Sequence, residues 1–113
     1  MFICNVLLEV PLKPKGRPTT SPLFFTVAKY NYVPPLQLGD EIQITNWGIG
    51  DWSDEPLSFI AAVTRIVKEV IPGKPEDVFK LSFYVEMADK DELLRIAEIF
   101  KKLNPGKFED ELY

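Results

Sequence analysis

The side chains that most often do chemistry in proteins are nearly absent from this chain. Its 113 residues include no histidine and only one cysteine, Cys4. Histidine is the usual general base near neutral pH and a common metal ligand, and a cysteine nucleophile needs a nearby base or a lowered pKa. Without histidine, no Ser-His-Asp triad can be assembled. The composition therefore favours a non-catalytic protein over an enzyme.

Cys4 stands in a run in which every second residue is hydrophobic. A buried thiol behaves as a small hydrophobic group, and burial raises its pKa and leaves it unreactive. We therefore predict a packing role for Cys4. A lone cysteine also cannot form an internal disulfide, which fits a reducing compartment.

The acidic residues could form only a metal site with oxygen ligands. Asp51, Asp54 and Glu55 lie in one loop and carry the donor atoms that calcium and magnesium prefer. Their spacing does not match the twelve-residue calcium loop. We expect a solvated acidic loop, with no metal and no other cofactor.

The same loop, residues 46–56, carries the main binding signal. It holds Trp47 and Trp52 with two glycines between them, and large amphipathic rings dominate the energetics of many protein interfaces. The candidate contact surface is Trp47 and Trp52 with the flanking Asp51 and Asp54. The alternative is that both rings fold back as a lid over the open end of a sheet, where burying an indole contributes a few kcal/mol.

Charge is unevenly distributed along the chain. Thirteen Lys and Arg against 17 Asp and Glu give a net charge of −4, which argues against general binding to nucleic acid or anionic membranes. Residues 11–22 contain three basic side chains, Lys13, Lys15 and Arg17, and no acidic one. They form a candidate second contact surface, with simple solvation as the alternative.

The first half of the chain has a β pattern. Residues 2–10 alternate between apolar and other side chains, which predicts a half-buried strand. Residues 11–22 contain four of the ten prolines, so we expect a mobile loop. β-Branched and aromatic residues predict a second strand over 23–33. A glycine turn then leads into a short strand within 36–44.

Residues 57–71 are ambiguous. Their apolar positions match a helical stripe, whereas their β-branched content favours a strand. The alternation over 79–87 is the strongest strand signal in the chain. We therefore predict a long strand over 57–71, joined to the next strand by a hairpin loop at 72–77.

The last element is a helix over 89–103. Asp89 and Glu92 form a variant of the capping box, and apolar residues then recur at helical spacing. The sequence Asn104-Pro105-Gly106 ends the run. Its apolar stripe should pack on the sheet.

Together these patterns predict one α+β domain over residues 1–113. We expect a mostly antiparallel sheet or small half-barrel of four or five strands, with the C-terminal helix packed on it. Residues 1–5 lack the basic segment of a signal peptide, and no apolar run approaches the ~20 residues needed to cross a bilayer. The sequence therefore predicts a cytoplasmic protein that does not bind membranes.

For function, the sequence favours a non-catalytic protein-interaction module or a subunit of an assembly. Phe24, Phe25, Tyr30 and Tyr32 are more aromatic residues than one sheet face easily buries, which suggests a homodimer. One alternative is a small-molecule-binding or enzymatic barrel whose pocket is closed by residues 46–56. A third is a single-stranded nucleic-acid binder that uses the basic loop and the tyrosines.

Overall fold

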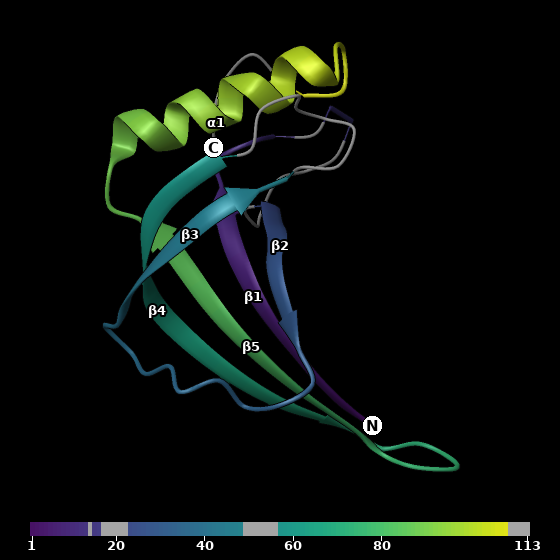
Figure 1. The fold of residues 1–113 in the computed structure, drawn as a ribbon. Coiled ribbons are helices and arrows are strands. Elements are labelled where there is room, and N and C mark those ends of the chain that lie inside the picture. The colour runs from purple at the N-terminus through teal and green to yellow at the C-terminus, as the bar shows by residue number, and fades with distance from the viewer. Residues whose placement is uncertain (14, 17–22, 49–56, 109–113) are drawn as a thin grey trace.

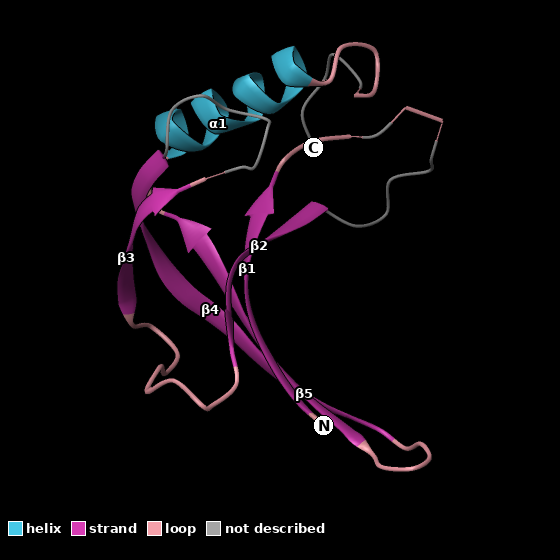
Figure 2. Cartoon of the chain, turned by 45° about the vertical axis from the view of Figure 1, so that its right-hand side comes forward, coloured by secondary structure: helices cyan, strands magenta, loops and turns pink. Residues whose placement is uncertain are grey.

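The fold is seen in a computed structural model that describes residues 1–13, 15–16, 23–48 and 57–108. Five strands form one sheet in the order β2-β1-β5-β4-β3, with β1 and β5 parallel and the other neighbours antiparallel. The sheet curls into a half-barrel, and the helix lies across one end of it (Figures 1 and 2). The elements are β1 (Phe2–Val10), β2 (Leu23–Tyr30), β3 (Glu41–Trp47), β4 (Leu57–Ile71), β5 (Val78–Met87) and α1 (Lys90–Leu103). The predicted α+β half-barrel is confirmed.

The long strand β4 explains why its sequence also resembles a helix. A β-bulge interrupts its pairing with β5 between Val63 and Arg65. Before the bulge the inward side chains have odd numbers, such as Phe59, and after it they have even numbers, such as Ile66 and Val70. One extra residue in a two-residue period therefore produces spacings of three, from Val63 to Ile66, and seven, from Phe59 to Ile66. These spacings are also those of a helix face.

The second strand is shorter than its sequence pattern predicts. β2 ends at Tyr30, where it pairs with Cys4, whereas the prediction extended to Val33. Residues 31–40 instead form the connection to β3. The β-forming composition of Tyr32 and Val33 is therefore not used in the sheet, and both side chains are exposed.

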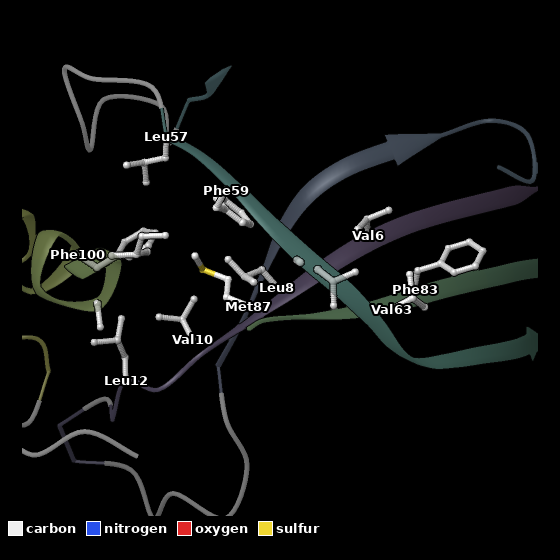
Figure 3. Close-up of a cluster of buried hydrophobic side chains, with 14 of the residues drawn as sticks. Val6, Leu8, Val10, Leu12, Leu57, Phe59, Val63, Phe83, Met87 and Phe100 are labelled. Carbon is white, nitrogen blue, oxygen red and sulfur yellow. The ribbon is translucent and has the colours of Figure 1, made fainter. Parts of the chain in front are cut away.

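The core lies between the concave face of the sheet, called the inner face here, and the helix. Figure 3 shows its side chains pointing into this space. The buried residues come from alternate positions of the three central strands, from Leu12 and from one stripe of α1: Cys4, Val6, Leu8, Val10, Leu12, Leu57, Phe59, Ala61, Val63, Leu81, Phe83, Val85, Met87, Ile96, Ala97 and Phe100. The inner face is therefore filled by packing near the helix.

The helix begins and ends close to the predicted positions. Asp89 is the N-cap, and its carboxylate accepts hydrogen bonds from the backbone N–H groups of Asp91 and Glu92 at 3.0 and 3.2 Å. The Glu92 side chain pairs with Arg95 at 2.6 Å. At the other end, the side chain of Asn104 donates to the carbonyl of Phe100 at 3.1 Å. Asp89 thus satisfies two backbone N–H groups at the start of the helix, and Asn104 satisfies one carbonyl near its end.

The lone cysteine gives a direct test of this packing. Cys4 is fully buried, and burial raises the pKa of its thiol. We expect Cys4 in the native protein to react with a thiol reagent such as DTNB orders of magnitude more slowly than in 6 M urea. The absorbance of released thionitrobenzoate measures both rates. Rapid labelling without denaturant would contradict the packing of β1.

The sheet narrows from five strands to three at the end opposite the helix. β3 pairs with β4 only as far as Ala62, and β2 pairs with β1 only from Cys4 onward. The second half of β4, the start of β5 and the start of β1 therefore project together (Figure 2). The radius of gyration, 15.4 Å, exceeds the value of about 13 Å expected for a compact chain of this length. We call this projection the arm.

Candidate interaction surface

The inner face of the arm carries a row of apolar side chains, of which Phe2 is half-buried and the other two are exposed. Phe2, Phe79 and Val70 are cross-strand neighbours on β1, β5 and β4. The rings of Phe2 and Phe79 stack with centroids 6.0 Å apart and an interplanar angle of 15°. Phe79 is 38% exposed and Val70 is 58% exposed. This row continues the inner face of the sheet beyond the point where the core ends.

Two tyrosines extend the row toward β2. Tyr30 lies opposite Cys4 at the end of β2, and Tyr32 follows it in the connecting segment. Their rings meet edge to face with centroids 5.4 Å apart, and Tyr32 is 57% exposed. We define the arm surface as Phe2, Tyr30, Tyr32, Val70 and Phe79.

A hollow lies between Phe2 and the two tyrosines of this surface. It has a volume of about 440 Å³ and is lined by Phe2, Ile3, Cys4, Lys29, Tyr30, Asn31 and Tyr32. A second hollow of about 280 Å³ shares both tyrosines and continues under the prolines of residues 34–35. The arm surface therefore offers room for side chains of a binding partner next to rigid rings.

The arm surface is open because neither α1 nor β3 extends to it. The helix packs at the other end of the inner face, where Phe100 meets the core (Figure 1). β3 begins at Glu41, opposite Ala62, and therefore does not reach the arm. Exposed aromatic and aliphatic groups gathered in one place are typical of contact sites on soluble proteins.

Trp47, one of the predicted contact residues, is part of the packing at the helix end. Its ring lies edge to face on Phe59 at 5.9 Å and tilted on Phe100 at 6.4 Å, and the side chain is half-buried. This arrangement agrees with the lid alternative for this residue. Asp51, Trp52 and Asp54 lie outside the described residues, so their predicted role stays a prediction.

The predicted basic surface is described only in part. Lys15 is exposed, and its backbone N–H donates to the carbonyl of Lys107 at 3.0 Å. A hollow of about 260 Å³ beside it is also lined by Lys101 and Lys102 near the end of α1. Lys13 is half-buried, and Arg17 lies outside the described residues. The fold thus brings Lys15 close to the lysines of the helix end, a grouping that sequence spacing did not predict.

A pair of carboxyl groups lies on the convex, outer face of the sheet. Glu9 and Glu86 come from the parallel neighbours β1 and β5 and line a hollow of about 200 Å³ with Lys90 and Leu93. Burial raises the pKa of Glu9, and a hydrogen bond to Glu86 and the negative charge of Glu86 raise it further, while Lys90 opposes them. The two carboxyl groups can therefore share a proton. Within the described residues, no three metal-binding side chains gather anywhere.

The carboxyl pair predicts a pH-dependent stability. Since the pKa of Glu9 is raised in the folded state, ionising Glu9 opposes folding, and stability falls as the pH rises through its titration. Glu9→Gln should therefore be more stable than wild type at pH 7, by about 0.2–1 kcal/mol for a like-charge cross-strand pair. The difference should shrink toward pH 4. Urea unfolding at both pH values measures the difference, with Glu41→Gln as the control because Glu41 is exposed and lies opposite Ala62. An unchanged stability of Glu9→Gln at pH 7 would contradict this prediction.

Comparisons with protein-family models, curated proteins and solved structures return no match. Among the residues the structure describes, no helix has the length and apolar character to span a membrane. Any proposal for function therefore depends on the geometry given above.

Proposed function

We propose that this chain is a non-catalytic interaction domain that acts as a subunit of a protein assembly and contacts a partner protein through the arm surface. The observation that carries this proposal is the row formed by Phe2, Phe79 and Val70 at the end of an otherwise packed inner face, in which Phe79 and Val70 are exposed and Phe2 is half-buried. The domain would hold these side chains on a rigid sheet and present them to the partner.

The aromatic rings of the arm surface favour a protein as its partner. Aromatic rings contribute large contact areas and lose little conformational entropy on binding, and they are enriched at the centres of interfaces. The rings of Phe2 and Phe79, and those of Tyr30 and Tyr32, already pack against each other in the unbound domain. Little ordering is then needed on association, which favours binding.

The surroundings of the surface indicate the chemistry of the partner. Lys29 lines the larger hollow, and Lys68 is exposed two residues before Val70 on β4. Lys68 lies on the inner face with Val70, whereas Lys29 comes from the other face of β2 and lies at the rim of the hollow. An apolar segment with acidic side chains beside it would fill the hollow and face the ammonium group of Lys68. The partner we propose is therefore an apolar segment flanked by Asp or Glu.

The packed interior favours this proposal over a ligand-binding barrel. At the helix end, the inner side chains of β1 and β5 and the buried stripe of α1 are all at most 3% exposed. A small molecule would need those side chains to move apart. The hollow beside Phe2 lies outside this core. The second hollow enters the half-barrel between Val27 of β2 and Ile42 of β3, and its volume of about 280 Å³ is below the ~300–1,000 Å³ typical of ligand pockets.

A matched pair of variants tests the proposal. Tyr32→Asp/Phe79→Asp places two charges on the arm surface, and Leu94→Asp/Leu103→Asp places two on α1, where both leucines are 43% exposed. Circular dichroism first establishes that both are folded. We expect affinity capture to recover a partner with wild type and the helix variant but not with the arm variant, and the purified partner to repeat this pattern.

Equal recovery by both variants would reject the arm surface as the contact. Failure of the recovered protein to bind after purification would reject a direct interaction. Loss of binding only in the helix variant would move the site to α1.

A further inference from the structure

The second half of β4 has a free edge. β3 pairs with β4 up to Ala62, and the connecting segment adds two backbone hydrogen bonds at Val63, from Gly39 N–H at 2.8 Å and to Asp40 C=O at 2.9 Å. Beyond Val63, β4 pairs with β5 on one side. Along its other side, from Thr64 to Ile71, no described segment forms a ladder.

A free edge of this length is a template for another strand. Every second residue of an unpaired edge directs its backbone N–H and C=O groups away from the sheet, and proteins usually cover such an edge or pair it. Most of the side chains here are exposed, and the apolar Val70 and Ile71 are 58% and 45% exposed. An added strand would therefore gain both backbone hydrogen bonds and apolar contacts.

The charge pattern of this edge is self-complementary. Arg65, Val67 and Glu69 lie opposite Tyr84, Ser82 and Lys80 of β5, on the outer face of the sheet. The positive and negative side chains are placed symmetrically on either side of Val67. In an antiparallel pair of identical strands centred on Val67, each arginine lies opposite the glutamate of the second copy.

Neighbouring registers are worse. Side chains that face each other in a sheet lie on the same face, so a two-fold pairing of identical strands must be centred on a residue. Centring on Lys68 places two lysines directly opposite each other. Centring on Ile66 places Arg65 opposite Val67 of the second copy, so the pairing of Arg65 with Glu69 is lost.

We propose that two copies of this chain associate through the free edge of β4, antiparallel, with Val67 on the two-fold axis. The two five-stranded sheets then form one continuous sheet. Two Arg65–Glu69 pairs, related by the axis, fix the register. This dimer goes beyond the partner contact proposed above, because it uses the strand edge, and Val70 is the one residue of the arm surface that it shares.

Charge exchange tests the register. Sedimentation equilibrium of wild type over a range of concentrations should give a reversible monomer–dimer equilibrium. Arg65→Glu and Glu69→Arg should each lower the association constant by about tenfold, because each creates two like-charge pairs across the axis. The double variant Arg65→Glu/Glu69→Arg should restore it. A wild type that stays monomeric, or a double variant as weak as the singles, overturns the proposal.

A disulfide tests the position of the axis. In the proposed dimer, residue 67 faces its own copy at a Cα separation of about 4.5–5.5 Å, which a disulfide can bridge. Val67→Cys should therefore give a covalent dimer on mild oxidation. Ile60→Cys is the matched control, because it lies on the same strand and is exposed but its edge is covered by β3. Equal cross-linking of both variants would indicate random collisions and reject the axis.

The two proposals fail separately. Tyr32→Asp/Phe79→Asp leaves the β4 edge unchanged, so it should keep the dimer while it loses the partner. Arg65→Glu leaves the arm surface unchanged and should weaken only the dimer.

Discussion

Phe100→Ala should lower the free energy of unfolding by about 3–5 kcal/mol, the range for a fully buried aromatic residue. Phe100 is completely buried, its ring stacks on Phe25 at 4.4 Å, and it also meets Trp47. It is the side chain through which the helix contacts both edges of the sheet, β2 and β3. Its loss would leave a cavity between the helix and the half-barrel.

Urea unfolding followed by circular dichroism measures this effect. Leu103→Ala is the control, because Leu103 lies on the same helix and is 43% exposed; we expect its effect to stay within about 0.5 kcal/mol. Similar effects for the two variants would contradict the docking of the helix through Phe100. Loss of the helix signal before that of the sheet would contradict a single cooperative core.

Trp47→Ala should destabilise the fold by about 2 kcal/mol, less than the ~3–5 kcal/mol of a fully buried aromatic residue. The reason is its half-buried position against Phe59 and Phe100. Trp47→Phe should recover much of the loss, because a smaller ring still packs between these neighbours. Chemical denaturation of the three proteins gives the comparison, and an unchanged midpoint for Trp47→Ala would contradict a packing role.

The packing of Trp47 also determines which variant can test the Trp-containing loop, residues 46–56. A variant that removes both tryptophans would lose packing energy at Trp47 whether or not the loop binds anything. Trp52→Ala alone is the cleaner test of a contact role for residues 46–56. Binding lost in Trp52→Ala with unchanged stability would support that role.

Much of the fold follows from local sequence patterns. The alternation in 2–10 and the cap at Asp89 are local signals, and the structure has both elements within about one residue. The bulge after Val63 is not a local signal, because it depends on how β4 follows the curvature of β5. For this reason residues 57–71 matched two periods at once.

The candidate sites were harder to predict because they depend on pairing between distant strands. Glu9 and Glu86 meet only because β1 and β5 are parallel neighbours. Phe2, Phe79 and Val70 form a row for the same kind of reason. A partial signal was present in the lengths: β4 has 15 residues and its neighbour β3 has 7. A strand that extends so far beyond its neighbour is expected to have exposed side chains and an unpaired edge.

The most direct test of the arm surface is site-specific photo-crosslinking in the native cell. A photoreactive amino acid at Tyr32 or Phe79 should form a covalent adduct of one defined size, and the same group at Leu94 should not. An adduct larger or smaller than a dimer of this chain identifies the partner protein by mass spectrometry. Adducts from Leu94 alone, or the same adducts from all three positions, would contradict the arm as the contact surface.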